Sequence, residues 1–230
     1  MTVGTPSKKY RLHKNLLCHH STFFDATFNG EFKEGKDGEL RLPEDEVRAF
    51  DTFVNWLYRG SLPPHGPHRS PDSALDDLSL YAMAEKWFIP TLQDAVCDQF
   101  RTRYIGGVCP LPYFFDHLYS ETSPSCKLRQ YFVKKFVMYA SSAQKEPARV
   151  TKALEQNADF AIDVAKETFS SLNLGGFGSQ QIFKNPENLP LCDFHAHGME
   201  KPCHSAQPKV GSTTAPVQSV FGGGFSHAKR

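Results

Sequence analysis

Short strand-like and helical patterns of apolar side chains alternate through the first hundred residues. Residues 9–12 and 40–42 alternate apolar with charged positions, which predicts two short strands. Ser21 stands before a Phe-rich stretch, and its hydroxyl is expected to cap a helix that begins at Thr22. Residues 35–38, Gly-Lys-Asp-Gly, indicate a turn.

Two clearer helical patterns follow residue 43. Apolar residues recur at steps of three and four, which places them on one helix face. They are Val47, Phe50, Val54 and Leu57, and then Ile89, Leu92, Val96 and Phe100. Gly60 is expected to end the first of these helices. The prolines and histidines of residues 61–71 indicate an exposed loop, and Ser70 before Pro71 favours a new helix start.

The rest of the chain divides into a helical and an irregular part. Leu128, Phe132, Phe136 and Ala140 recur every four residues, and two neighbouring valines widen the stripe, so this helix is expected to be buried on more than one side. From residue 172 onward the chain is rich in Gly, Ser, Pro and Asn. We therefore expect a mixed region at 1–105, a helical extension at 106–171 and a low-complexity tail at 172–230.

Composition and charge narrow the class of protein. The 230 residues are 40% hydrophobic and 22% charged, with a formal net charge of +1. This suits a soluble globular protein and gives no electrostatic footprint for nucleic acid, which is an unlikely partner. No signal peptide or membrane-spanning stretch is expected, so the sequence favours the cytosol or the nucleus, where its six cysteines would be reduced.

The N-terminal region resembles the BTB/POZ domain. The resemblance lies in Tyr10, Leu12-His13-Lys14, Leu16-Leu17-Cys18, the helix start from Ser21 to Phe24, Leu40 and Leu42, the helix from Phe50 to Gly60, and the segment from Leu80 to Trp87 with Leu92. The Pro/His loop and the helical extension are similar to those of BTB proteins from filamentous fungi. The resemblance implies an α+β fold, in which a small three-stranded sheet caps a cluster of helices.

The resemblance also implies a function in holding proteins together. Such domains commonly form dimers, and many act as substrate adaptors that hold a cullin scaffold of a ubiquitin ligase, while others serve in transcription complexes. In this chain only Thr2 and Val3 correspond to the family's first strand, which often contributes to dimer pairing. Formation of a homodimer therefore stays open.

Phe32-Lys33-Glu34 is a candidate partner-binding motif. Cullin adaptors of this family often carry an apolar residue, any residue and then Glu just after the second helix, which is where these residues stand. An exposed Phe32 could anchor in a groove of a scaffold helix. Equally well, Phe32 could pack against its own domain while Glu34 is solvated.

Cys192, His195, His197 and Cys203 form the one cluster with metal-ligand chemistry in the sequence. Two thiolates and two imidazoles suit tetrahedral zinc, and His204 is a substitute ligand. Asp193 and Glu200 are near in sequence, but no carboxylate is obviously placed for catalysis, which favours a closed, structural site. The alternative is a disordered tail that happens to contain these residues. If zinc does bind, a nuclear regulatory factor that uses residues 192–204 is a second functional hypothesis.

No pattern in the sequence indicates an enzyme. There is no nucleophile elbow, phosphate-binding glycine loop or dinucleotide fingerprint. Cys18 follows two leucines, so burial is a better explanation for it than nucleophilic chemistry. The sequence therefore predicts a protein-interaction adaptor or scaffold without catalytic residues.

Overall fold

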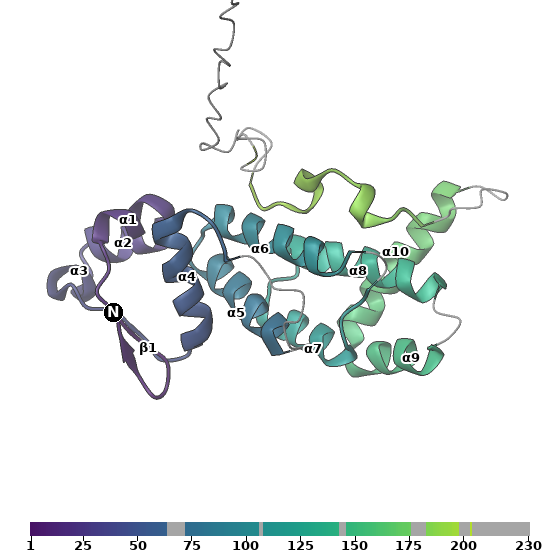
Figure 1. Ribbon diagram of the computed structural model, residues 1–230, viewed down its shortest axis with the longest axis horizontal. Helices are drawn as coiled ribbons and strands as arrows, with labels where there is room; N and C mark the ends of the chain where they lie inside the picture. The colour runs from purple at the N-terminus through teal and green to yellow at the C-terminus, as the bar shows by residue number, and fades with distance from the viewer. Residues whose placement is uncertain (64–71, 106–107, 143–145, 176–182, 198–202, 204–230) are drawn as a thin grey trace, which may run out of the picture.

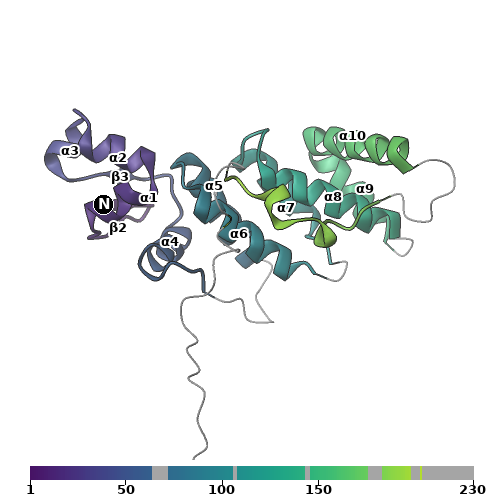
Figure 2. The same ribbon diagram turned by 90° about the horizontal axis from the view of Figure 1, so that it is seen from above.

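Helices make up most of the computed structural model, which describes residues 1–63, 72–105, 108–142, 146–175, 183–197 and 203. They lie in a row, with the sheet and α1–α3 at one end and α9 and α10 at the other (Figures 1 and 2). Among the described residues, no helix combines the length and the apolar character needed to cross a bilayer.

The sheet is small and closes the N-terminal end. It consists of β1 (Thr2–Val3), β2 (Lys8–Lys9) and β3 (Arg41–Leu42), in the order β2-β1-β3. β1 runs antiparallel to β2 and parallel to β3. The strand expected at residues 9–12 is thus shorter and begins one residue earlier, while Leu40 and Leu42 are buried as their alternation predicts.

Three short helices follow β2. They are α1 (Lys14–His20), α2 (Thr22–Asn29) and α3 (Lys33–Asp37). The predicted cap is confirmed, because Ser21 Oγ accepts a hydrogen bond of 3.1 Å from the backbone N–H of Phe24. The turn expected at residues 35–38 is wrong for residues 35–37, which belong to α3. The helix ends at Gly38, which has a φ of +64°.

The larger helices of the first region are α4 (Val47–Arg59), α5 (Asp72–Lys86) and α6 (Pro90–Arg103). Gly60 ends α4 with a φ of +70°, as expected. The buried face of α4 is rotated from the predicted stripe, since Phe53 and Trp56 are buried while Val47 and Val54 are only half-buried. Residues 64–71, which include the expected Ser70 cap, lie outside the described residues.

Aromatic rings fill the interior of this region. The rings of Phe24 and Phe53 both lie 5.1 Å from that of Trp87, and that of Phe50 lies 5.8 Å from it. Ser21 also ties this interior to α5, because its hydroxyl donates a 2.6 Å hydrogen bond to the Trp87 carbonyl. Buried aromatic groups of this size dominate the free energy of a core.

The extension contains α7 (Pro112–Glu121), α8 (Lys127–Ser142), α9 (Pro147–Gln156) and α10 (Ala158–Gly175). As the widened stripe predicts, α8 is buried on several sides, including Phe132, Val133 and Phe136. α10 continues beyond the expected boundary at residue 171. One hydrophobic cluster includes residues from Val3 to Phe160 and also Phe194, so the extension shares a continuous interior with the first region.

Part of the expected tail is folded onto the helices. Residues 185–197, here called the strap, include the 3-10 turns η1 (Pro186–Asn188) and η2 (Leu191–Phe194). The strap runs along α6 and α8 (Figure 1). This docking was not expected from the composition of residues 172–230.

Candidate functional site

The strap is anchored by one aromatic side chain. Phe194 is 2% exposed, and its ring lies 5.3 Å from the ring of Tyr131 on α8. The Arg101 guanidinium of α6 lies 5.4 Å from the centre of the same ring, within the range of a cation–π contact. Phe194 therefore fixes the strap between the two helices.

Buried cations provide the second set of anchors. The Lys135 side chain on α8 is completely buried, and its ammonium pairs with the Glu187 carboxylate of the strap. Arg101 donates to the backbone carbonyls of Leu189 and Glu187 at 3.1 and 3.3 Å. Because a buried charge without a partner is costly, these contacts fix the position of the strap closely.

The four predicted metal ligands come together where the strap meets α6. The donor atoms of Cys192, His195, His197 and Cys203 all lie within 4.8 Å of one another. His195 Nδ1 lies 3.2 Å from His197 Nε2 and 3.3 Å from Cys203 Sγ. The two shorter separations are close to the edge of a tetrahedron of nitrogen and sulfur ligands around zinc, where bonds are about 2.0–2.3 Å long. The donor set could thus hold a metal ion.

Two carboxylates of α6, those of Asp94 and Asp98, accept contacts from the segment that carries the cluster. His195 Nε2 lies 3.0 Å from Asp98 Oδ1, and the backbone N–H of Ala196 donates to Asp94 Oδ1. With the Asp98 carboxylate on Nε2, the Nδ1 of His195 faces His197 and Cys203, and a carboxylate on the second ring nitrogen is common around metal-bound imidazoles. Burial alone would lower the pKa of His195, but the hydrogen bond to Asp98 and the nearby negative charges raise it.

Sequence reasoning missed these two carboxylates. Asp94 and Asp98 lie about a hundred residues before the ligands, so only Asp193 and Glu200 were near in sequence. Asp193 is exposed, and Glu200 lies outside the described residues, as does the substitute ligand His204. The available signal was the spacing of four between Asp94 and Asp98, which places two acids on one face of α6.

Phe32 and Glu34 lie elsewhere, on α3 at the sheet end of the molecule (Figure 1). Phe32 is the N-cap residue of α3 and is 61% exposed, so it does not pack into its own domain. Glu34 is half-buried in the first turn, where a negative charge is also favourable to the helix dipole. The structure thus presents Phe32 to solvent and leaves Glu34 partly accessible beside it.

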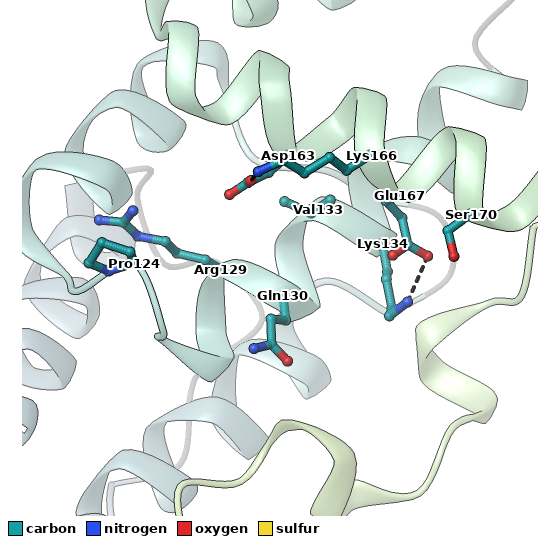
Figure 3. Close-up of a pocket in the computed structure, with 9 residues that line it drawn as sticks. All are labelled: Pro124, Arg129, Gln130, Val133, Lys134, Asp163, Lys166, Glu167 and Ser170. Carbon is teal, nitrogen blue, oxygen red and sulfur yellow. Dashed lines mark hydrogen bonds and ion pairs between the residues drawn. The ribbon is translucent and has the colours of Figure 1, made fainter.

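A groove between α8 and α10 is lined by paired charges (Figure 3). It encloses about 410 Å³. Lys134 forms a 2.6 Å salt bridge with Glu167, and Lys166 forms one of 3.1 Å with Asp163. The first pair joins α8 to α10 and the second lies within α10, and such mutual pairing leaves these groups poorly suited to chemistry.

The cysteine thiols outside the cluster have raised pKa values, as is expected of side chains that pack in the interior. Burial raises the pKa of Cys18 and raises that of Cys109 to about 12. A thiol with a raised pKa is a poor nucleophile at neutral pH. This agrees with the expectation that Cys18 packs rather than reacts.

Comparison with known proteins identifies the first region. Residues 1–104 match the family model of the BTB/POZ domain. BTB/POZ domain-containing protein 3 of Homo sapiens is 36% identical over 97 residues, which cover 40% of this chain and 16% of that protein. BTB/POZ domain-containing protein 17 of Mus musculus is 29% identical over 109 residues, 47% of this chain and 20% of that protein.

A third relative is similar over a stretch of about the same length. BTB/POZ domain-containing protein 6-B of Danio rerio is 33% identical over 95 residues, which cover 40% of this chain and 18% of that protein. The similarity to these relatives thus spans at most a fifth of their length. No solved structure gives a significant match to the chain. The fold, the aromatic interior and these matches together identify residues 1–104 as a BTB/POZ domain, a module of protein–protein interaction.

Proposed function

We propose that the chain is an adaptor in which the BTB/POZ domain holds one protein and the helical extension holds another. The family match and the continuous core support this proposal, because a shared interior fixes the two surfaces relative to each other. The raised thiol pKa values and the paired charges between α8 and α10 fit a binding role better than a catalytic one. Six free cysteines suit the reducing cytosol or nucleus.

The proposed partner of the BTB/POZ domain is a cullin scaffold. The observation that carries this proposal is the exposure of Phe32 at the start of α3, with Glu34 two residues later on the same short helix. An exposed aromatic side chain on a rigid element can fill a pocket of a partner and supply much of the binding free energy. Glu34 could then pair with a basic residue at the rim of that pocket.

A binding assay with the N-terminal part of a cullin tests this proposal. We expect the double variant Phe32→Ala, Glu34→Ala to lose at least about tenfold in affinity, since an aromatic hot spot is worth roughly 2 kcal/mol or more. The matched control is Phe169→Ala, which removes an equally exposed phenylalanine from α10. Equal binding by both variants, or no binding by the wild type, would exclude the cullin role.

A second proposal concerns the metal site. The close approach of four donor atoms, with Asp98 behind His195, favours a structural zinc ion held by Cys192, His195, His197 and Cys203. All four positions of a tetrahedron would be protein ligands, so the ion would stabilise structure and leave no open position for a substrate. The nuclear regulatory hypothesis rests on this same cluster, and the net charge of +1 does not strengthen it.

Metal analysis of the purified chain tests the zinc proposal. We expect about one zinc ion per chain, and loss of that ion in Cys203→Ser. Cys18→Ser is the matched control, because Cys18 is also half-buried but lies on α1. A wild-type chain without bound zinc, or a Cys203→Ser chain that keeps it, would contradict the proposal.

A further inference from the structure

We infer that Cys192 and Cys203 form a disulfide bond with each other under oxidising conditions, and that this bond and a metal ion at the Cys/His cluster exclude each other. The first part depends only on the position of the two thiols. The second part rests on the proposed metal site, because both sulfur atoms are among its four donor atoms. The pair is thus a thiol–disulfide modification site whose co-reactant is a small-molecule disulfide such as oxidised glutathione.

The two thiols are close enough to bond. The sulfur atoms of Cys192 and Cys203 belong to a set of donor atoms that all lie within 4.8 Å of one another, and the Cys203 side chain is a hydrogen-bond partner of Cys192. A disulfide bond is about 2.05 Å long, so the sulfur atoms have to approach by no more than about 2.8 Å, which rotation of the side chains about χ1 can cover. Neither cysteine belongs to α6 or α8, so the bond can form while those helices stay packed.

Accessibility separates this pair from the other cysteines. Cys18 is half-buried but lies on α1, at the sheet end of the molecule (Figure 1). Three others are buried: Cys97, Cys109 and Cys126. Cys192 is exposed and Cys203 is half-buried beside it. An oxidant in solution therefore reaches Cys192 first, and Cys203 is in position to resolve the product.

The reaction is thiol–disulfide exchange in two steps. The Cys192 thiolate attacks one sulfur of oxidised glutathione, forms a mixed disulfide and releases one glutathione thiolate. The Cys203 thiolate then attacks the Cys192 sulfur and displaces the second glutathione thiolate. The two cysteine thiols together lose two electrons and two protons, and the two glutathione thiols that form take them up.

The same sulfur atoms cannot serve both a disulfide and zinc. Zinc binds cysteine as the thiolate, and neither sulfur of a disulfide is a thiolate. Oxidation therefore leaves only His195 and His197 of the four donors, so a bound ion should be released. Conversely, a thiolate that donates its electron pair to zinc is less available as a nucleophile, so bound zinc should protect the pair.

Oxidation of the full chain tests the inference. Metal-stripped protein is incubated with oxidised glutathione, and its thiols are counted after denaturation. We expect two of the six thiols to disappear, and the proteolytic peptide that carries Cys192 and Cys203 to become lighter by two hydrogen atoms. A zinc-loaded sample should oxidise at least about tenfold more slowly. Reduction with a dithiol should restore both thiols and the capacity to bind zinc.

Two variants identify the steps. Cys203→Ser lacks the resolving thiol, so its reaction should stop at the mixed disulfide and Cys192 should carry one glutathione. Cys18→Ser is the matched control, because it removes a half-buried thiol from α1 and should still form the bond. Circular dichroism shows whether each variant is folded, and the zinc content of every sample is measured alongside.

The outcomes separate the disulfide from the metal site. A metal-stripped wild-type chain in which Cys192 carries only glutathione, or in which a different pair of cysteines bonds, overturns the inference even where zinc binds. A bond that forms equally fast with and without bound zinc overturns the mutual exclusion. If the bond forms but no sample binds zinc, the disulfide site stands and the proposed metal site falls.

Discussion

The BTB/POZ domain and the strap are held in place by different kinds of contact. In the domain, Phe24, Phe50, Phe53 and Trp87 form a ring cluster with less than 1% exposure. In the strap, Phe194 and Pro186 are buried, and the polar anchors include a salt bridge, two carbonyl contacts, a histidine–carboxylate contact and the hydrogen bond from Ala196 to Asp94. The domain is stabilised by a large aromatic interior, whereas directional contacts make up a larger part of what holds the strap.

This difference predicts different responses to change. Removing one ring from a packed core lowers global stability, because neighbouring side chains lose contacts and a cavity remains. Removing one anchor of the strap should instead open a local segment while the helices stay folded. The two regions can therefore be distinguished by whether a substitution changes global unfolding or only local protection.

The largest effect is expected from Phe53→Ala. Phe53 is fully buried among aromatic rings, and such a truncation typically lowers the free energy of unfolding by about 3–5 kcal/mol. Chemical denaturation followed by circular dichroism measures this loss. Phe169→Ala is the control, since Phe169 is 67% exposed and should change stability little. Comparable losses in the two variants would show that Phe53 is not part of a packed core.

Glu187→Ala should have the next largest effect, and a local one. It leaves the Lys135 ammonium buried without its counter-charge, which weakens docking of the strap by about 3 kcal/mol. We expect hydrogen exchange to become fast in residues 185–197, while the amides of α5 and α6 stay protected.

A double variant sharpens this prediction. Replacing both Lys135 and Glu187 by Met removes the buried charges together and should restore much of the protection, because an apolar pair of similar volume is often as stable as a buried ion pair. If the double variant exchanges as fast as Glu187→Ala, the pair is not what holds the strap.

Gly4→Ala is expected to have a moderate effect within the sheet. Gly4 has a φ of +76°, and an added Cβ would lie 2.5 Å from Cγ2 of Val47. Strain and overlap together should lower the free energy of unfolding by about 2–3 kcal/mol. Gly38→Ala is the control, because Gly38 has a similar φ of +64° but an added Cβ there would meet no atom within 4 Å. A thermal melt in which both variants lose the same stability would show that the overlap with Val47 relaxes freely.

Periodicity was informative where apolar burial decides the structure. The steps of three and four along α4 and α6 located both helices, and the stripe of α8 showed burial on several sides. The Ser21 cap followed from local chemistry alone. The rotation of the buried face of α4 toward Phe53 and Trp56 did not follow, because it depends on which neighbouring helix packs there.

The candidate metal ligands could be selected from sequence, but their surroundings could not. Four donors within a short segment are visible as a pattern, and the structure brings them together. Asp98, Lys135 and Arg101 are distant in sequence, and each reads as an ordinary charged residue of a helix. Their contacts form only where the strap packs across α6 and α8. A segment rich in Gly, Pro and Asn has no hydrophobic periodicity from which this packing could be predicted.

The smallest effect is expected at a polar anchor that remains in solvent. Asp51 of α4 accepts hydrogen bonds of 2.8 Å from Lys8 Nζ and from Tyr10 Oη, so it fixes β2 to the helix as Glu187 fixes the strap to α8. Its side chain is 43% exposed, however, and an exposed ion pair is screened by water and salt. Asp51→Asn should therefore change stability by no more than roughly 0.5 kcal/mol at neutral pH.

The pH dependence identifies this contact as electrostatic. Partial burial alone would raise the pKa of Asp51, but the hydrogen bonds from Lys8 and Tyr10 outweigh it and lower the pKa below the ordinary 3.8. A carboxyl whose pKa is lowered by folding stabilises the fold above its unfolded pKa, and this contribution is lost as the pH falls through the folded value. The stability difference between wild type and Asp51→Asn should thus be constant between about pH 5 and neutral pH and vanish in stronger acid, as measured by denaturation at a series of pH values. A difference that persists in strong acid would mean that Asp51 acts through packing, and the contrast between exposed and buried polar anchors would then fail.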